Sequence, residues 1–248
     1  MHSNDIGLRY QQLVHDRRRL GDERYGARHL RRNDLASDRV QEAADTVVYL
    51  TLTGRAWAAG QVPFSAELEE RLARLIRDAI RLGERCSALA EPDAPAAEAF
   101  AAVLRERFDF GERHHGEAFL ARENLGEALE EIVDCDILVE LERERDRANA
   151  RPNRELGEIS DSCAALGELV LALRDRVVRE HPHILDGEAI PADRRALQAE
   201  RDGLARLIER VRVALAASPR PHRTHANGSG NGRVPGRING AQPPRRAA

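Results

Sequence analysis

Apolar residues recur at steps of three and four in several long segments, which is the spacing of one face of an α-helix. The clearest segments span residues 68–82, 153–180 and 193–216. Ser65 and Asn153 precede two of them and are residue types that favour helix N-caps. Each apolar face must be covered by another element, so the pattern predicts an all-α helical bundle. The longest seam has the heptad positions Leu156, Ile159, Cys163, Leu166, Val170, Leu173 and Val177.

One segment has the composition of a β-strand. Residues 45–53 read DTVVYLTLT and are rich in β-branched side chains. A lone strand would have no partner, because no other segment has this character. We therefore predict that residues 45–53 are helical.

The chain contains an internal similarity that organises the bundle. Residues 13–35 and 103–125 align without a gap. The segment Glu42–Asp45 then aligns with Glu131–Asp134 after a shift of one residue. The similarity predicts an internal duplication of a multi-helix unit. The identical pairs are Arg17 with Arg107, Gly21 with Gly111, Gly26 with Gly116, Leu30 with Leu120, Arg32 with Arg122, and Leu35 with Leu125.

Three regions follow from this duplication. Residues 1–90 form helical unit 1, and residues 91–217 form helical unit 2, which carries an extra helix near 153–180. Residues 218–248 contain five prolines, five glycines and six arginines but no acidic residue, a composition that predicts a disordered tail.

The formal charge divides unevenly between the tail and the rest of the chain. The whole chain carries −3 and the six arginines give the tail +6, which leaves −9 on residues 1–217. A basic tail predicts either a weak, salt-sensitive contact with nucleic acid or a solvated segment close to its own acidic body. No aromatic residue lies between the arginines to stack on bases.

The composition excludes several classes of function and location. All 39 basic residues are arginines, so a Walker A phosphate loop and a Schiff-base lysine are excluded. No apolar run is long enough to cross a membrane, and the first ten residues do not resemble a secretory signal. The three cysteines (Cys86, Cys135 and Cys163) form no CxxC pair, which favours buried thiols in a reducing cytoplasm. We expect a cytoplasmic protein.

Acidic residues at helical spacing are the strongest candidates for chemistry. Neighbours three and four apart on a helix lie close enough for like charges to repel, and a divalent cation would remove that cost. Oxygen ligands without paired His or Cys favour Mg²⁺, Mn²⁺ or Ca²⁺. The alternative is a solvated acidic face that pairs with nearby arginines. The candidate metal ligands are Glu127, Glu130, Glu131 and Asp134, together with Glu42 and Asp45 of the first unit.

The segment EAADTVVYL at residues 42–50 resembles the ExxD helix of the MazG-type all-α nucleotide pyrophosphohydrolases. Glu131–Asp134 is a looser match to the same helix. The resemblance covers about ten residues in each unit, and the EExxE helix of that family has no counterpart at the usual distance. The resemblance implies helical bundles that often dimerise. It also implies Mg²⁺ held by carboxylates and cleavage of nucleoside triphosphates to monophosphate and pyrophosphate.

Two hypotheses about function follow. The first is a Mg²⁺-dependent, MazG-like nucleoside triphosphate pyrophosphohydrolase, active or degenerate, in which Arg32 and Arg122 contact the phosphates. It predicts that the two ExxD helices face each other around a cavity with perturbed carboxylates. The second is a non-catalytic helical interaction protein that uses its heptad face and basic tail to bind a helical partner or a second copy. It predicts carboxylates spread over the solvent-exposed surface and no cavity.

Overall fold

Helices form the whole regular structure of the described residues, which are 3–25, 34–63, 65–115, 123–149 and 153–185 in a computed structural model. No strand occurs among them, so the prediction of an all-α fold is confirmed. The tail and the expected helix at 193–216 lie outside the described residues. The elements are α1 (Ser3–Tyr25), α2 (Leu35–Ala58), α3 (Ala66–Ala90), α4 (Ala96–His115), α5 (Asn124–Ala148), α6 (Arg154–Glu180) and the short 3₁₀ helix η3 (Pro182–Leu185).

The strand-like segment at residues 45–53 lies in the middle of α2, as predicted. Its threonines are accommodated because each hydroxyl donates to a carbonyl four residues earlier in the helix. Thr46 Oγ1 lies 2.9 Å from the Glu42 oxygen, and Thr51 Oγ1 lies 2.8 Å from the Val47 oxygen. The polar groups of this buried segment are therefore satisfied without a sheet.

The two predicted N-caps are confirmed. Ser65 Oγ accepts a hydrogen bond from the Leu68 amide at 3.2 Å and begins α3. Asn153 Oδ1 accepts one from the Glu155 amide at 2.9 Å and begins α6. Both side chains satisfy amides that the first helical turn leaves without an intrahelical partner.

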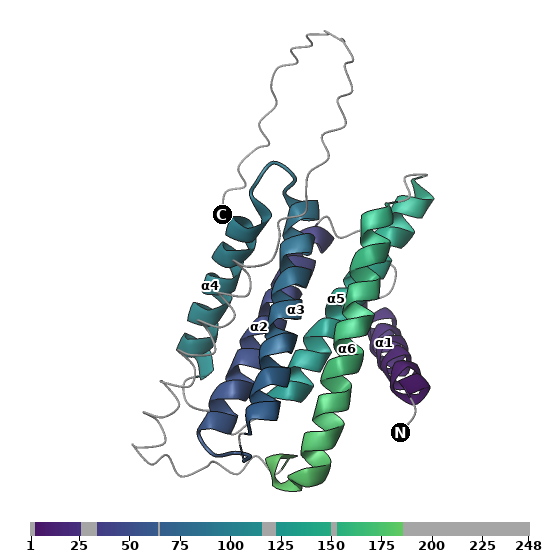
Figure 1. The fold of residues 1–248 in the computed structure, drawn as a ribbon. Helices are drawn as coiled ribbons and strands as arrows, with labels where there is room; N and C mark the ends of the chain where they lie inside the picture. The colour runs from purple at the N-terminus through teal and green to yellow at the C-terminus, as the bar shows by residue number, and fades with distance from the viewer. Residues whose placement is uncertain (1–2, 26–33, 64, 116–122, 150–152, 186–248) are drawn as a thin grey trace, which may run out of the picture. The chain divides into compact units, whose positions relative to one another are not determined.

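Helices α2, α3, α5 and α6 form the centre of the bundle, and α1 and α4 pack on the outside of it (Figure 1). Helix α2 packs along α5, while α3 packs on α2 and α6 packs on α5. The outer helix α4 lies on α2 and α3, and α1 lies on α5 and α6, on the opposite flank. Each outer helix therefore covers helices from the other predicted unit, and the two units interlock.

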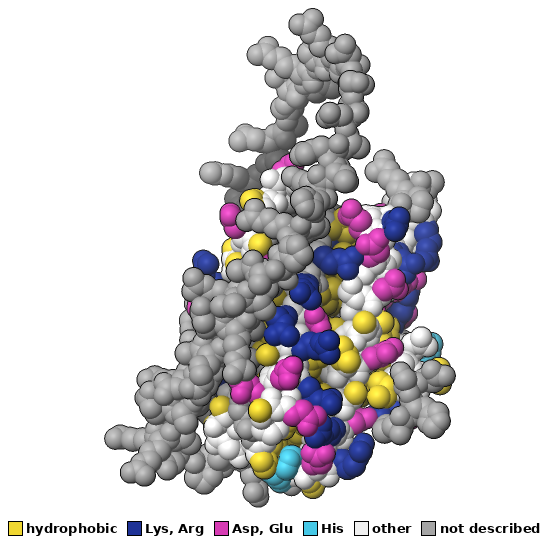
Figure 2. All heavy atoms as spheres, viewed as in Figure 1, with side chains coloured by type: hydrophobic (Ala, Val, Ile, Leu, Met, Phe, Trp, Pro, Cys, Tyr) yellow, Lys and Arg dark blue, Asp and Glu magenta, His cyan; other side chains and the backbone are white. Residues whose placement is uncertain are grey.

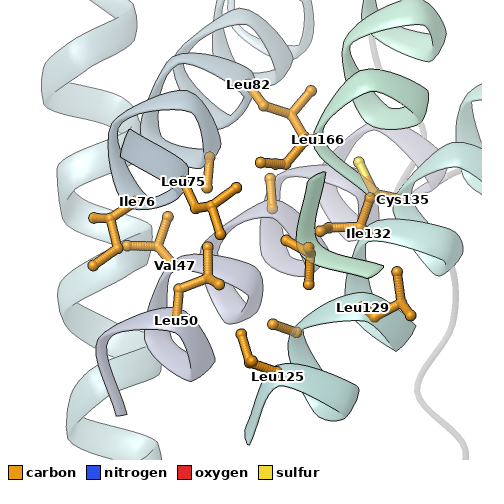
Figure 3. Close-up of a cluster of buried hydrophobic side chains, with 14 of the residues drawn as sticks. Val47, Leu50, Leu75, Ile76, Leu82, Leu125, Leu129, Ile132, Cys135 and Leu166 are labelled. Atoms are coloured by element: carbon orange, nitrogen blue, oxygen red, sulfur yellow. The ribbon is translucent and has the colours of Figure 1, made fainter. Parts of the chain in front are cut away.

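The core between the central helices is built from aliphatic side chains (Figure 3). Val47 and Leu50 of α2 meet Leu75 of α3, Ile132 of α5 and Leu166 of α6. All five side chains are at most 3 % exposed. This matches the composition, in which aromatic residues make up only 4 % of the chain.

A ring-on-glycine contact fixes each outer helix. Tyr10 of α1 covers Gly167 of α6, where an added Cβ would lie 2.0 Å from Tyr10 Cε2. Phe100 of α4 covers Gly83 of α3, where a Cβ would lie 2.0 Å from Phe100 Cζ. Both rings are 1 % exposed. These contacts make the packing of α6 on α5 similar to the packing of α3 on α2. The sequence prediction instead gives unit 2 an extra helix near 153–180. The duplication itself stays a prediction.

The face shared by α3 and α6 carries both signs of charge, with arginines and carboxylates interspersed (Figure 2). Arg85 of α3 pairs with Glu158 of α6 at 2.8 Å, and Arg176 of α6 pairs with Glu67 of α3 at 2.7 Å. Within the described residues, no helix combines the length and the apolar character that crossing a membrane requires.

Candidate metal centre

Three carboxylates from two helices meet where α2 packs on α5. We call Glu42 and Asp45 of α2 and Glu131 of α5 the carboxylate cluster. One oxygen of each lies within 4.8 Å of one oxygen of the others, and all three side chains are half-buried. Three of the four acidic residues of the two ExxD segments therefore lie together between α2 and α5.

Local sequence explains why the cluster forms. A spacing of three places Glu42 and Asp45 on one side of α2, next to the face that α5 covers. The residues between them are alanines, and both are fully buried. Ala128 of α5 is also fully buried. Small side chains at this contact let the helix backbones approach closely, which brings the longer acidic side chains beside them together.

The pKa values of Glu42 and Glu131 are both raised where the two side chains meet. Burial raises the pKa of Glu131, and its hydrogen bond to Glu42 raises it further. Burial also raises the pKa of Glu42, although the hydrogen bond from Glu131 opposes that rise. Two carboxylates in contact in a low dielectric cannot both ionise without a nearby positive charge.

Two arginines neutralise the aspartates of the ExxD segments. Arg107 Nε of α4 donates to Asp45 Oδ1 at 2.7 Å. Arg17 Nε and Nη2 of α1 donate to Asp134 at 2.9 and 2.8 Å. These hydrogen bonds raise the pKa of both arginines. The two ion pairs are equivalent in position, because each outer helix reaches the ExxD helix that it covers.

The structure separates the six predicted metal ligands into two groups. Glu42, Asp45 and Glu131 meet, and the charge of Asp134 acts on both glutamates. Glu130 instead lies on the Arg17 side of α5, 3.2 Å from its Nη1, with a side chain that is 62 % exposed. Glu127 lies in the first turn of α5 and is not part of the cluster.

The predicted phosphate ligands Arg32 and Arg122 lie outside the described residues. Arg17 and Arg107 are the arginines that reach the ExxD carboxylates, and the sequence prediction missed that role. The signal was present, because these two residues are identical at equivalent positions of the internal similarity. The periodicity of α1 and α4 did not show which helix each would cover.

A hollow lies beside each of the two arginines. The first has a volume of about 500 Å³ and is formed by α1, α5 and α6, with Arg17 and Glu130 at its wall and Leu129 and Leu171 among its lining residues. The second has a volume of about 410 Å³ and includes Arg107. Both lie in the size range of small-molecule sites, which is about 300–1,000 Å³.

The donor set of the carboxylate cluster fits a hard divalent cation. All its atoms are oxygens, which Mg²⁺, Mn²⁺ and Ca²⁺ prefer. With metal–oxygen lengths of about 2.1 Å for Mg²⁺ and up to about 2.6 Å for Ca²⁺, opposite ligands are roughly 4.2 to 5.2 Å apart. The oxygens of the cluster lie within 4.8 Å of one another, which is close enough for one cation to contact all three side chains. A cation there would favour the ionised forms of Glu42 and Glu131, whose pKa values are raised without it.

Comparison with protein-family models, with characterised proteins and with solved structures found no match to this chain.

Proposed function

We propose that this chain is a Mg²⁺-dependent, MazG-like nucleoside triphosphate pyrophosphohydrolase. The observation that carries the proposal is the carboxylate cluster itself, in which Glu42, Asp45 and Glu131 converge from two ExxD helices. Burial, and then the charges of the neighbouring aspartates, raise the pKa of both glutamates. Perturbed carboxylates gathered from separate elements are typical of sites with a chemical role.

The residues have separate tasks in this proposal. Glu42, Asp45 and Glu131, with Asp134 beside them, would hold Mg²⁺, which neutralises phosphate charge and lowers the pKa of a bound water. Arg17 and Arg107 would exchange their aspartate partners for phosphate oxygens, which guanidinium groups bind in a bidentate manner. The hollow beside Arg17, with Leu129 and Leu171 in its lining, would receive the nucleoside.

Pyrophosphate release from a panel of NTPs and dNTPs with Mg²⁺ or Mn²⁺ tests the proposal. We expect release by the wild type and a loss of activity of at least about 100-fold in Glu131→Gln and Asp45→Asn. Removing a group that only supports a metal ligand costs about 10- to 100-fold, so removing a ligand should cost at least the upper value. Glu127→Gln is the matched control, because it removes a carboxylate from the same helix outside the cluster. Equal activity in all four proteins would refute the assignment of these residues.

The alternative function is a non-catalytic helical interaction protein, and one observation favours it. The charge of the cluster is already offset without a cation, because the raised pKa values of Glu42 and Glu131 favour their neutral forms and Arg17 and Arg107 pair with the aspartates. A degenerate site would have this arrangement. If a folded wild type releases no pyrophosphate and Mn²⁺ does not bind in a calorimetric titration, the interaction protein becomes the better account.

A further inference from the structure

Three cysteines from three helices meet in the core. We call Cys86 of α3, Cys135 of α5 and Cys163 of α6 the thiol cluster. Cys163 Sγ donates to Cys135 Sγ at 3.7 Å, and Cys86 also interacts with Cys135. All three are free thiols with no exposed surface, as the sequence predicts for buried thiols. Figure 3 shows Cys135 among the aliphatic side chains of the core.

Arg39 of α2 brings an unusual buried charge to this cluster. Its side chain is fully buried, and only its Nη1 is paired, with Glu142. Its Nε and Nη2 have no hydrogen-bond partner. Arg39 lies next to the thiols, because Cys135 Sγ donates to its backbone oxygen at 3.8 Å. Its charge also opposes the rise in the pKa of Cys86 that Cys135 and burial cause. A buried donor without an acceptor costs folding free energy, and an anion next to these two N–H groups would remove that cost.

The equivalent helices show that packing alone does not require a thiol on α6. The ring-covered glycines Gly83 and Gly167 put α3 and α6 in register. In that register Cys163 corresponds to Ala79. Ala79 is also fully buried, so the other half of the bundle fills the same position with a methyl group.

The same comparison applies to α5 and α2, which the two ExxD segments put in register. Cys135 then corresponds to Thr46, and Arg39 corresponds to Ala128. Thr46 and Ala128 are both fully buried. Thiols and a guanidinium thus occupy positions at which the equivalent half uses residues with no soft ligand and no charge.

Ligand chemistry narrows what the thiol cluster can hold. Soft thiolates select cations such as Cu(I), whereas a structural zinc site needs four ligands in a tetrahedron. The chain brings three thiols here, and the sulfurs of Cys135 and Cys163 are joined by a hydrogen bond of 3.7 Å. A monovalent cation on two thiolates leaves a complex with one negative charge, which the unpaired face of Arg39 can stabilise by hydrogen bonds.

We propose that Cys135 and Cys163 bind one Cu(I) ion as a two-thiolate site, with the Arg39 guanidinium beside it. Both thiols release their protons to solvent on binding, and no electron is transferred. A linear S–metal–S unit with bonds of about 2.3 Å spans about 4.6 Å. The two sulfurs, now 3.7 Å apart, would therefore separate by roughly 1 Å, shared between two side chains. Cys86 stays a thiol next to Cys135.

An anaerobic titration of the full chain with Cu(I), against a competing colorimetric Cu(I) chelator, tests the proposal. We expect one equivalent to bind and the Cys163→Ala variant to lose at least 100-fold in affinity. Cys86→Val is the matched control and should retain binding, because valine fills the equivalent buried position, Val170 of α6. Glu131→Gln should also retain binding, since the carboxylate cluster is a separate site.

Two further measurements keep the test decisive. Circular dichroism melts establish that each variant is folded, and Cys163→Ser replaces Cys163→Ala if the alanine variant is not. Arg39→Met should weaken Cu(I) binding in a folded protein, because it removes the charge beside the thiolates. A wild type that takes no Cu(I) from the chelator, or a Cys163→Ala variant that binds as tightly as the wild type, overturns the proposal.

Discussion

Asp136 of α5 makes the stability of this protein depend on pH. Its carboxyl is 6 % exposed and accepts hydrogen bonds from Ser160 Oγ at 2.8 Å and from Tyr10 Oη at 3.3 Å. Burial outweighs these bonds and raises its pKa from 3.8 to about 6. The carboxyl is therefore more easily ionised in the unfolded chain than in the folded one.

The sign and size follow from linkage. Below about pH 4 both states hold the proton, and this group has no net effect. As the pH rises to about 6, the unfolded chain loses the proton first, so stability falls; above 6 the loss is complete. At about 1.4 kcal/mol for each pH unit between the two values, the ionised Asp136 costs about 3 kcal/mol at pH 7.

Urea denaturation of the wild type and Asp136→Asn at pH 4, 5, 6 and 7 measures this cost. Asparagine cannot ionise, so the stability of the variant relative to the wild type should increase by about 3 kcal/mol between pH 4 and 7. The change cancels any constant effect of altered hydrogen bonds. Tyr10→Phe should show the opposite trend, because it removes a donor that lowers the pKa of Asp136. A constant difference between wild type and Asp136→Asn across this range would refute the reasoning.

Four other substitutions test the packing, the capping and the raised pKa of Glu131. Gly167→Ala should destabilise the protein by about 1–3 kcal/mol because its Cβ would meet the Tyr10 ring, whereas Gly157→Ala, with nothing within 4 Å, should stabilise it by about 1 kcal/mol in thermal or chemical unfolding. Ser65→Ala should cost about 1 kcal/mol in urea denaturation, because the first turn of α3 loses its cap. The stability of Glu131→Gln relative to the wild type should rise between pH 5 and pH 8. The pKa of Glu131 is raised to about 10, so over this range the unfolded wild type ionises while the folded chain keeps the proton, and an unchanged difference between the two pH values would contradict this.

Much of the local structure could be predicted because its causes lie close together in the sequence. Ser65 and Asn153 are N-caps, and each satisfies an amide two or three residues away. The helix at residues 45–53 was predicted against its β-branched composition, since a lone strand would have no partner. The spacing of Glu42 and Asp45 also placed both on one side of α2.

The remaining features depend on contacts between distant segments. Helical periodicity identifies a face that must be covered, but not the helix that covers it. The buried role of Asp136 could not be predicted for this reason, because it depends on Tyr10 and Ser160, which lie on α1 and α6. Arg17 and Arg107 likewise reach carboxylates on helices of the other unit.

The crossed packing of the outer helices has a consequence for the order of synthesis. Helix α1 is translated before the other described helices, whereas α5 and α6, on which it packs, come after α2, α3 and α4, and Arg9 pairs with Asp175, 166 residues later. Domains generally fold as they emerge, N-terminal parts first. Here the Tyr10 ring of α1 stays exposed until Gly167, the residue that it covers, has been translated. We therefore expect a ribosome-bound chain that ends before α6 to be more easily cleaved by protease in α1 than in α2 and α3, which already have each other as partners.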